Sequence, residues 1–145
     1  MRILVVEDQE SHIQDARAIL DQEGVEYDLV RTEGAAVRQL RDGDQFDGVI
    51  TDLFLPHSDK APWTDADQPC GLAVALKAEQ LGLPFVICTS GYHHGAKYDW
   101  ICQVGRQRGW PEMVDSSTDY TKEADKKNWK EALEVLLELI AAKAK

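Results

Sequence analysis

The chain of 145 residues is long enough for one domain with one hydrophobic core. Its hydrophobic content of 43% and charged content of 29% are typical of a soluble globular protein, and no segment approaches the ~20 apolar residues of a membrane span. The formal net charge of -10 argues against nucleic acid or an anionic membrane as a partner, because both require a basic face.

Strand-like and helix-like segments alternate along the chain. In chain order the pattern predicts a strand at 3–6, a helix from the cap Ser11 to Gly24, a strand at 27–31, a helix at 33–41, a strand at 48–53, a helix at 71–81, a strand at 85–88, a helix at 97–108, a short strand at 113–114 and a last helix that begins near Trp129. The stripe that predicts the last helix consists of Trp129, Leu133, Leu136, Leu137 and Ile140. Leu72, Ala75 and Leu76 are expected to face inward from the helix at 71–81.

This order predicts the α/β class, with a doubly wound five-stranded parallel sheet of (βα)5 topology. Right-handed crossovers place helices on both faces, which gives a three-layer, flavodoxin-like architecture. Residues 1–145 are expected to form a single domain. The start of the chain enters a strand without the regions of a signal peptide, and Cys70, Cys88 and Cys102 have no paired spacing, so we expect free thiols and a cytoplasmic location.

Acidic side chains follow two of the predicted strands. Glu7 and Asp8 end the first strand, and Asp52 ends the third. One such acid alone would be an ordinary strand end that begins a turn. Because the carboxyl ends of parallel strands meet at one edge, the three together predict a divalent metal site, with one carboxylate left as a nucleophile. Thr89 and Ser90, which follow the fourth strand, add hydroxyl donors and suit phosphoryl transfer to a carboxylate with Mg²⁺.

The chain resembles the response-regulator receiver domains of two-component signalling over nearly its whole length. The resemblance rests on three segments, which are Val5-Val6-Glu7-Asp8, Ile50-Thr51-Asp52-Leu53-Phe54-Leu55-Pro56 and Pro84-Phe85-Val86-Ile87-Cys88-Thr89-Ser90-Gly91-Tyr92. It implies a single receiver domain at 1–145 without an output domain.

By this resemblance, Asp52 accepts a phosphoryl group from the phosphohistidine of a sensor histidine kinase or a phosphotransfer protein. Glu7 and Asp8 hold Mg²⁺ together with Asp52, and the backbone carbonyl of Phe54 is a further ligand. Counting from Pro84 favours Thr89 as the hydroxyl that senses the phosphate, whereas the Ser-Gly-Tyr pattern favours Ser90. The chain would then be a signalling domain that binds a downstream protein, and not a turnover enzyme.

Two features depart from the receiver pattern. Receivers carry a lysine just after the fifth strand, but Ser116 stands about where it belongs and Lys122 is too far along the chain, so we expect the site to lack this cation. The segment between Pro56 and Cys70 is also too long for an ordinary βα loop. Its acidic residues, His57 and Cys70 match no zinc spacing, so we expect a solvated or partner-binding loop.

Three alternatives to a phosphorylated receiver have other requirements. The missing lysine favours a pseudo-receiver that binds partners without phosphate, whereas the intact acids argue against one. A metal-dependent phosphatase would carry a second aspartate two residues after Asp52, where Phe54 stands. A flavin- or nucleotide-binding protein would need glycines where Glu7 and Asp8 are.

Overall fold

The computed structural model describes residues 1–41, 45–58, 68–89, 99–115 and 127–145. Strands and helices alternate, as the sequence predicts. The elements are β1 (Arg2–Val6), α1 (Glu10–Gln22), β2 (Glu26–Val30), α2 (Glu33–Gln39), β3 (Gly48–Thr51), α3 (Gly71–Gln80), β4 (Phe85–Thr89), α4 (Asp99–Arg108), β5 (Val114–Asp115) and α5 (Trp129–Lys143). All five strands are parallel and lie in the order β2-β1-β3-β4-β5, which confirms the predicted doubly wound sheet.

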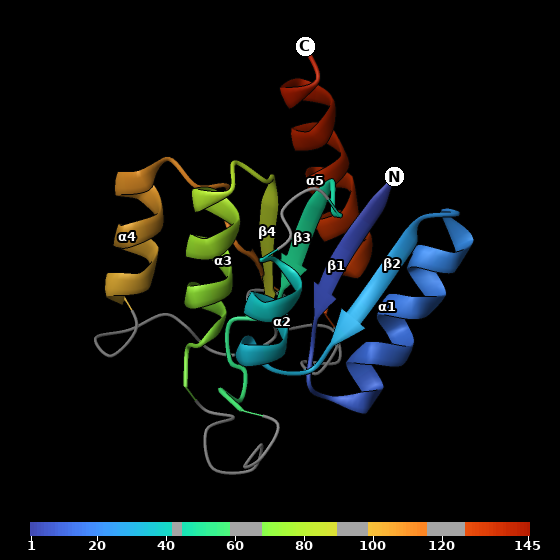
Figure 1. The fold of residues 1–145 in the computed structure, drawn as a ribbon, viewed down its shortest axis with the longest axis horizontal. Helices are drawn as coiled ribbons and strands as arrows, with labels where there is room; N and C mark the ends of the chain where they lie inside the picture. Colours follow the sequence, from blue (N-terminus) through green and yellow to red (C-terminus); the bar gives the residue numbers. More distant parts are fainter. Residues whose placement is uncertain (42–44, 59–67, 90–98, 116–126) are drawn as a thin grey trace, which may run out of the picture.

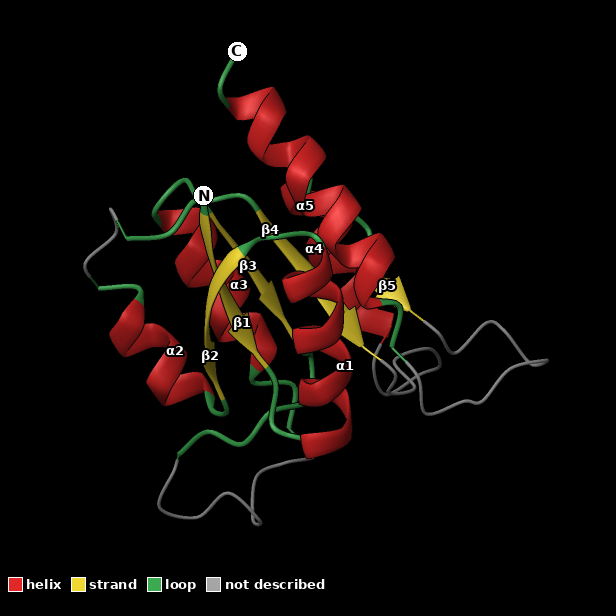
Figure 2. Cartoon of the chain, turned by 90° about the vertical axis from the view of Figure 1, so that its right-hand side faces the viewer, coloured by secondary structure: helices red, strands yellow, loops and turns green. Residues whose placement is uncertain are grey.

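Each central strand contributes side chains to two hydrophobic layers. In β1, for example, Leu4 and Val6 belong to one buried cluster, whereas Ile3 and Val5 belong to the other. This alternation follows from the two-residue period of a strand, and the continuous apolar runs show that both faces are covered. The first cluster packs against α2, α3 and α4, and the second packs against α1 and α5. Figure 2 shows the sheet between α2 on one side and α1 with α5 on the other.

Helix ends and faces differ from the sequence prediction at two points. The cap of α1 is Gln9, and Ser11 lies inside the helix, because the helix begins directly after the acidic pair of β1. In α3, Ala75 is buried as expected, but Leu76 is 43% exposed. Val74 and Ala78 are buried in its place, because the face toward the sheet begins at Gly71 and follows the helical spacing from there. The Trp129 stripe of α5 is confirmed as core.

The carboxyl ends of the strands form one edge of the sheet, toward which the arrowheads of β1, β2 and β3 point in Figure 1. The residues at the two ends of the long segment between Pro56 and Cys70 make backbone contacts beside this edge. Leu55 forms a bridge with Pro69, and the backbone carbonyls of Pro56 and His57 accept hydrogen bonds from the first two amides of α2, each at 3.0 Å. Residues on both sides of this segment are therefore held by backbone contacts close to the end of β3.

Cys70, Cys88 and Cys102 form no disulfide with one another. Among the helices that the structure describes, none combines the length and the apolar character needed to cross a bilayer.

Candidate functional site

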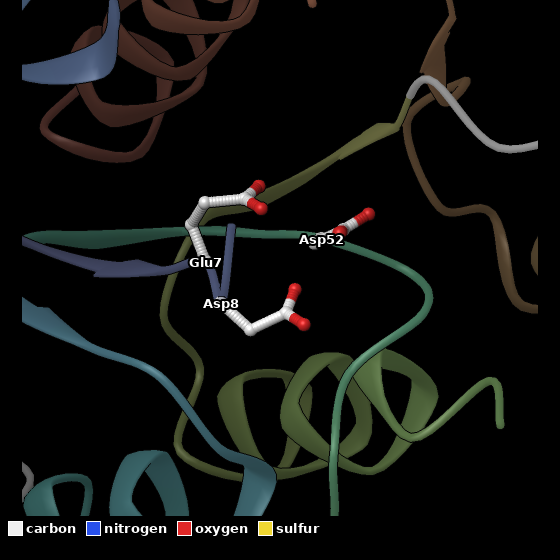
Figure 3. A group of neighbouring side chains, drawn as sticks. All are labelled: Glu7, Asp8 and Asp52. Atoms are coloured by element: carbon white, nitrogen blue, oxygen red, sulfur yellow. The ribbon is translucent and has the colours of Figure 1, made fainter. Parts of the chain in front are cut away.

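Three carboxylates meet at the carboxyl edge of the sheet. Glu7 and Asp8 directly follow β1, Asp52 directly follows β3, and these two strands pair side by side. One oxygen from each side chain lies within 4.8 Å of the others. Figure 3 shows the carboxylates of Glu7 and Asp8 extending toward the side where Asp52 lies. Among the described residues, this is the one group of three or more potential metal ligands, and the predicted convergence at the edge is what the structure shows.

The backbone around Asp52 fixes the position of its carboxylate. The amide of Asp52 donates to the carbonyl of Val6 at 2.9 Å, and the amide of Leu53 donates to Asp52 Oδ1 at 2.7 Å. The start of α3 closes against the same point, since the amide of Gly71 donates to the carbonyl of Leu53 at 2.9 Å. A Cβ atom on Gly71 would come within 1.9 Å of the Asp52 carbonyl oxygen, so only glycine permits this approach.

A lysine that the sequence analysis did not identify completes the site. Lys127 Nζ lies 2.9 Å from Asp52 Oδ2 and donates a hydrogen bond to Glu7 Oε2. The side chain of Lys127 is 1% exposed, so this is a buried ion pair. The expectation that the site lacks this lysine is therefore wrong, and the cation is Lys127, eleven positions after Ser116, where the sequence analysis expected it.

The sequence does not reveal this lysine when positions are counted from the fifth strand. β5 has only two residues, and residues 116–126 separate it from Lys127. A short strand gives a poor starting point for counting, whereas the apolar stripe of α5 marks its helix clearly. Counting backward from Trp129 would have pointed to the lysine that stands just before the helix cap Asn128.

The electrostatics of the site reflect crowding of negative charge around one buried cation. Burial raises the pKa of Glu7 to about 7, the charge of Asp52 acts in the same direction, and Lys127 opposes both. Burial and then Asp52 also raise the pKa of Asp8. Burial lowers the pKa of Lys127, but the carboxylates of Asp52 and Glu7 outweigh it and the net shift is upward. Lys127 is thus held as an ammonium beside Glu7 and Asp52.

Asp8 gives the test of whether a divalent cation fits. Its Oδ1 atom is buried and accepts no hydrogen bond from any residue in the described part of the chain. A buried carboxylate oxygen without a donor is costly unless a cation binds it. The ammonium of Lys127 is paired with Glu7 and Asp52. The donor set of three carboxylates suits Mg²⁺, which prefers oxygen ligands.

The other predicted site residues are placed in part. Thr89 ends β4 at the same edge and is 1% exposed, whereas Ser90 lies outside the described residues. The structure does not test whether the Phe54 carbonyl is a ligand. In the long segment after Pro56, the Nδ1 atom of exposed His57 lies 2.5 Å from Glu33 Oε2, and residues 59–67 lie outside the described part. Ser116 and Lys122 also lie outside it.

Comparison with known proteins shows similarity at the level of the fold. No protein-family model matches the chain, and no curated protein matches it in sequence. Among solved structures, a response regulator receiver protein from Sinorhizobium medicae WSM419 is 19% identical, with a TM-score of 0.64 over 98% of this chain and 95% of that one. A CheY-like receiver domain protein from Methanospirillum hungatei JF-1 is 16% identical, with a TM-score of 0.65 over 99% and 95% of the two chains.

A third similar structure is the N-terminal domain of a response regulator/sensory box/GGDEF protein from Carboxydothermus hydrogenoformans. It is 21% identical, with a TM-score of 0.63, and the match covers 100% of both chains. These similarities extend over the whole sheet and its helices and are not limited to one motif. The chain therefore has the fold of the response-regulator receiver domains.

Proposed function

We propose that the chain is a response-regulator receiver that accepts a phosphoryl group on Asp52 and signals by binding a partner protein. The observation that carries the proposal is the meeting of Glu7, Asp8 and Asp52 at one edge, with an ion pair from Lys127 to the acceptor carboxylate. The donor would be the phosphohistidine of a sensor histidine kinase or a phosphotransfer protein. The receiver fold supports this assignment, because each side chain stands at the edge where doubly wound sheets bind ligands.

The chemistry requires a carboxylate nucleophile and nearby positive charge. An oxygen of Asp52 forms a bond to phosphorus while the P–N bond of the donor breaks, and the imidazole nitrogen keeps the electron pair of that bond. Negative charge on the phosphoryl oxygens must be neutralised nearby. Lys127 offers its ammonium at 2.9 Å from Asp52 Oδ2. Mg²⁺ held by Glu7, Asp8 and Asp52 would add a second cation to those oxygens.

The remaining parts of the proposal concern how the phosphate is sensed. The hydroxyl of Thr89 or of Ser90 would donate a hydrogen bond to a phosphoryl oxygen and so join the end of β4 to the new charge. The product is an acyl phosphate on the chain itself, so the chain would act as a signalling domain and not as a turnover enzyme. Its downstream target would be a protein.

Two rival functions receive less support. The pseudo-receiver was favoured by the missing lysine, and Lys127 removes that argument. The phosphatase would need an acid two residues after Asp52, but Phe54 is half-buried and packs against the first hydrophobic cluster.

The test is incubation with acetyl phosphate and Mg²⁺, followed by intact-mass measurement. We expect the parent protein to gain the mass of one phosphoryl group and Asp52→Asn to gain none. Asp15→Asn, which changes an exposed aspartate on α1, is the matched control and should behave as the parent does. No gain in the parent at high donor and Mg²⁺ concentration, or a gain that persists in Asp52→Asn, would contradict the proposal.

A further inference from the structure

The position of the Lys127 ammonium depends on how α5 begins. The three carboxylates directly follow strands of the sheet, whereas Lys127 directly precedes the cap of α5. Residues 116–126 lie between β5 and Lys127, so the short last strand does not hold the lysine in place through adjacent backbone. Lys127 is held by the start of α5 and by the contacts of its own side chain.

The first turn of α5 is fixed by its cap. Asn128 Oδ1 accepts a hydrogen bond from the amide of Glu131 at 3.2 Å, and Asn128 Nδ2 donates to Glu131 Oε2 at 2.8 Å. These contacts satisfy an amide that would otherwise lack a partner at the start of the helix. They set the backbone on one side of Lys127, but they do not touch its ammonium.

Trp129, in the first turn of α5, does contact the ammonium. Lys127 Nζ lies 5.6 Å from the centroid of the Trp129 ring, within the range of a cation–π contact. Trp129 is 3% exposed and belongs to the hydrophobic cluster shared by α1, α5 and the sheet. Its indole N–H makes no hydrogen bond to any residue that the structure describes, and its contact with Lys127 is made through the ring.

The environment makes this contact stronger than the same contact at a surface. The Lys127 side chain is 1% exposed, and cation–π contacts are stronger where the cation is desolvated. The ammonium is thus held by the carboxylates of Glu7 and Asp52 and by an aromatic ring that is itself fixed in the core.

We propose that Trp129 is a positioning residue for the phosphoryl transfer, because its ring holds the Lys127 ammonium beside Asp52. This inference rests on the proposed function. It goes beyond it by assigning to a core residue of α5 the task of placing the cation, a task that the two-residue β5 does not perform. A general contribution to the core would be a different role, and the two roles predict different results.

The first measurement is the rate of phosphorylation by acetyl phosphate in Trp129→Phe and Trp129→Leu. Phenylalanine keeps a ring with a weaker attraction for cations, whereas leucine keeps only the apolar bulk. We expect the rate to fall in the order parent, Trp129→Phe, Trp129→Leu, with a loss on the order of tenfold for leucine, the size that a buried cation–π contact implies. Equal rates in the phenylalanine and leucine variants would contradict the inference.

The second measurement is a double-mutant cycle with Lys127→Met. If Trp129 acts through Lys127, Trp129→Leu should have almost no further effect on the rate once the lysine is absent. A purely structural role predicts the same fold loss in both backgrounds, which would overturn the inference. Leu133→Ala, which removes a core side chain one turn further along α5, is the control and should lose stability without coupling to Lys127.

A third measurement separates failure of this inference from failure of the proposed function. Protons beside the Lys127 ammonium should show an upfield ring-current shift in the NMR spectrum of the unphosphorylated parent, and Trp129→Leu should abolish it. If the parent accepts no phosphoryl group, the proposed function fails while this shift still shows whether the ring holds the lysine. Absence of the shift in the parent would refute the positioning role even if phosphorylation occurs.

Discussion

The acidic half and the cationic half of the site are built in different ways. Glu7, Asp8 and Asp52 directly follow paired strands, and backbone hydrogen bonds to β1 and from Leu53 fix Asp52. Lys127 stands before a helix and is held by side-chain contacts to Glu7, Asp52 and Trp129. The backbone of the sheet thus positions the acidic half of the site, whereas side-chain packing positions the cationic half. The two halves should therefore respond differently to mutation.

The largest effect is expected for Lys127→Met. It removes the ammonium that, among the described residues, pairs with Glu7 and Asp52, and it leaves two buried carboxylates beside each other. Breaking a buried ion pair in this way costs about 3 kcal/mol or more, and urea unfolding at pH 8 without Mg²⁺ should show this loss. Lys130→Met, at an exposed position of the same helix, is the control and should stay within about 0.5 kcal/mol of the parent. Equal stability of Lys127→Met and the parent would show that the ion pair is not formed in solution.

Gly71→Ala tests the acidic half through its backbone. The new Cβ would lie 1.9 Å from the Asp52 carbonyl oxygen, so the start of α3 must shift. Such overpacking should lower the free energy of unfolding by about 1–3 kcal/mol. Phosphorylation by acetyl phosphate should also slow, because the shift of α3 displaces Asp52.

Gly105→Ala is the matched control in α4, because its Cβ would meet the Trp110 ring at an ordinary 3.7 Å. The free energy of unfolding of Gly105→Ala should rise by about 0.5–1 kcal/mol, since alanine is more favourable than glycine inside a helix. Similar changes in both variants, measured by chemical unfolding, would mean that the close approach of α3 to Asp52 is absent.

Mg²⁺ should stabilise the parent through the acidic half. A cation that binds only the folded chain adds about 1.4 kcal/mol at roughly ten times its Kd. The thermal midpoint should rise with Mg²⁺ in the parent and in Asp15→Asn, but much less in Asp8→Asn, where the oxygen that lacks a donor is part of a neutral amide. An undiminished Mg²⁺ effect in Asp8→Asn would place the ion elsewhere.

The stability of the metal-free protein should depend on pH through Glu7. Burial raises the folded-state pKa of Glu7 from 4.5 to about 7. Between these two values the folded state holds a proton that the unfolded chain has released. The contribution of Glu7 protonation to the free energy of unfolding is therefore fully present below about pH 4.5 and is lost as the pH rises through about 7. The difference in unfolding free energy between the parent and Glu7→Gln should therefore change across this window. A difference that is flat from pH 4.5 to 7.5 would contradict the shift.

Sequence reasoning succeeded where function follows local structure. The apolar runs of β1 and β3 and the acids that end them lie within a few residues of each other, so their meeting at one edge follows from the parallel sheet alone. The position of Lys127 depends on how α5 packs on the sheet, with Trp129 in the cluster that α1 and α5 share, and this packing is a long-range feature. The inward face of α3 was misplaced at Leu76 for a similar reason, because helical spacing gives a stripe but the neighbouring elements decide where it points.

A difference in accessibility is expected at Cys88, which lies in β4 on the face that α5 covers. Burial raises the pKa of its thiol to about 12, and the reactive form of a cysteine is the thiolate. Under native conditions iodoacetamide should therefore modify the half-buried Cys70 and Cys102 first and Cys88 only on unfolding. In Lys127→Met, iodoacetamide should alkylate Cys88 faster only in proportion to the larger unfolded fraction that the measured loss in unfolding free energy implies. The reason is that Leu133 and Leu136 still hold α5 against the sheet. A larger increase, followed by mass spectrometry of the alkylated peptides, would show that α5 opens locally and that Lys127 fastens this helix to the sheet as well as serving Asp52.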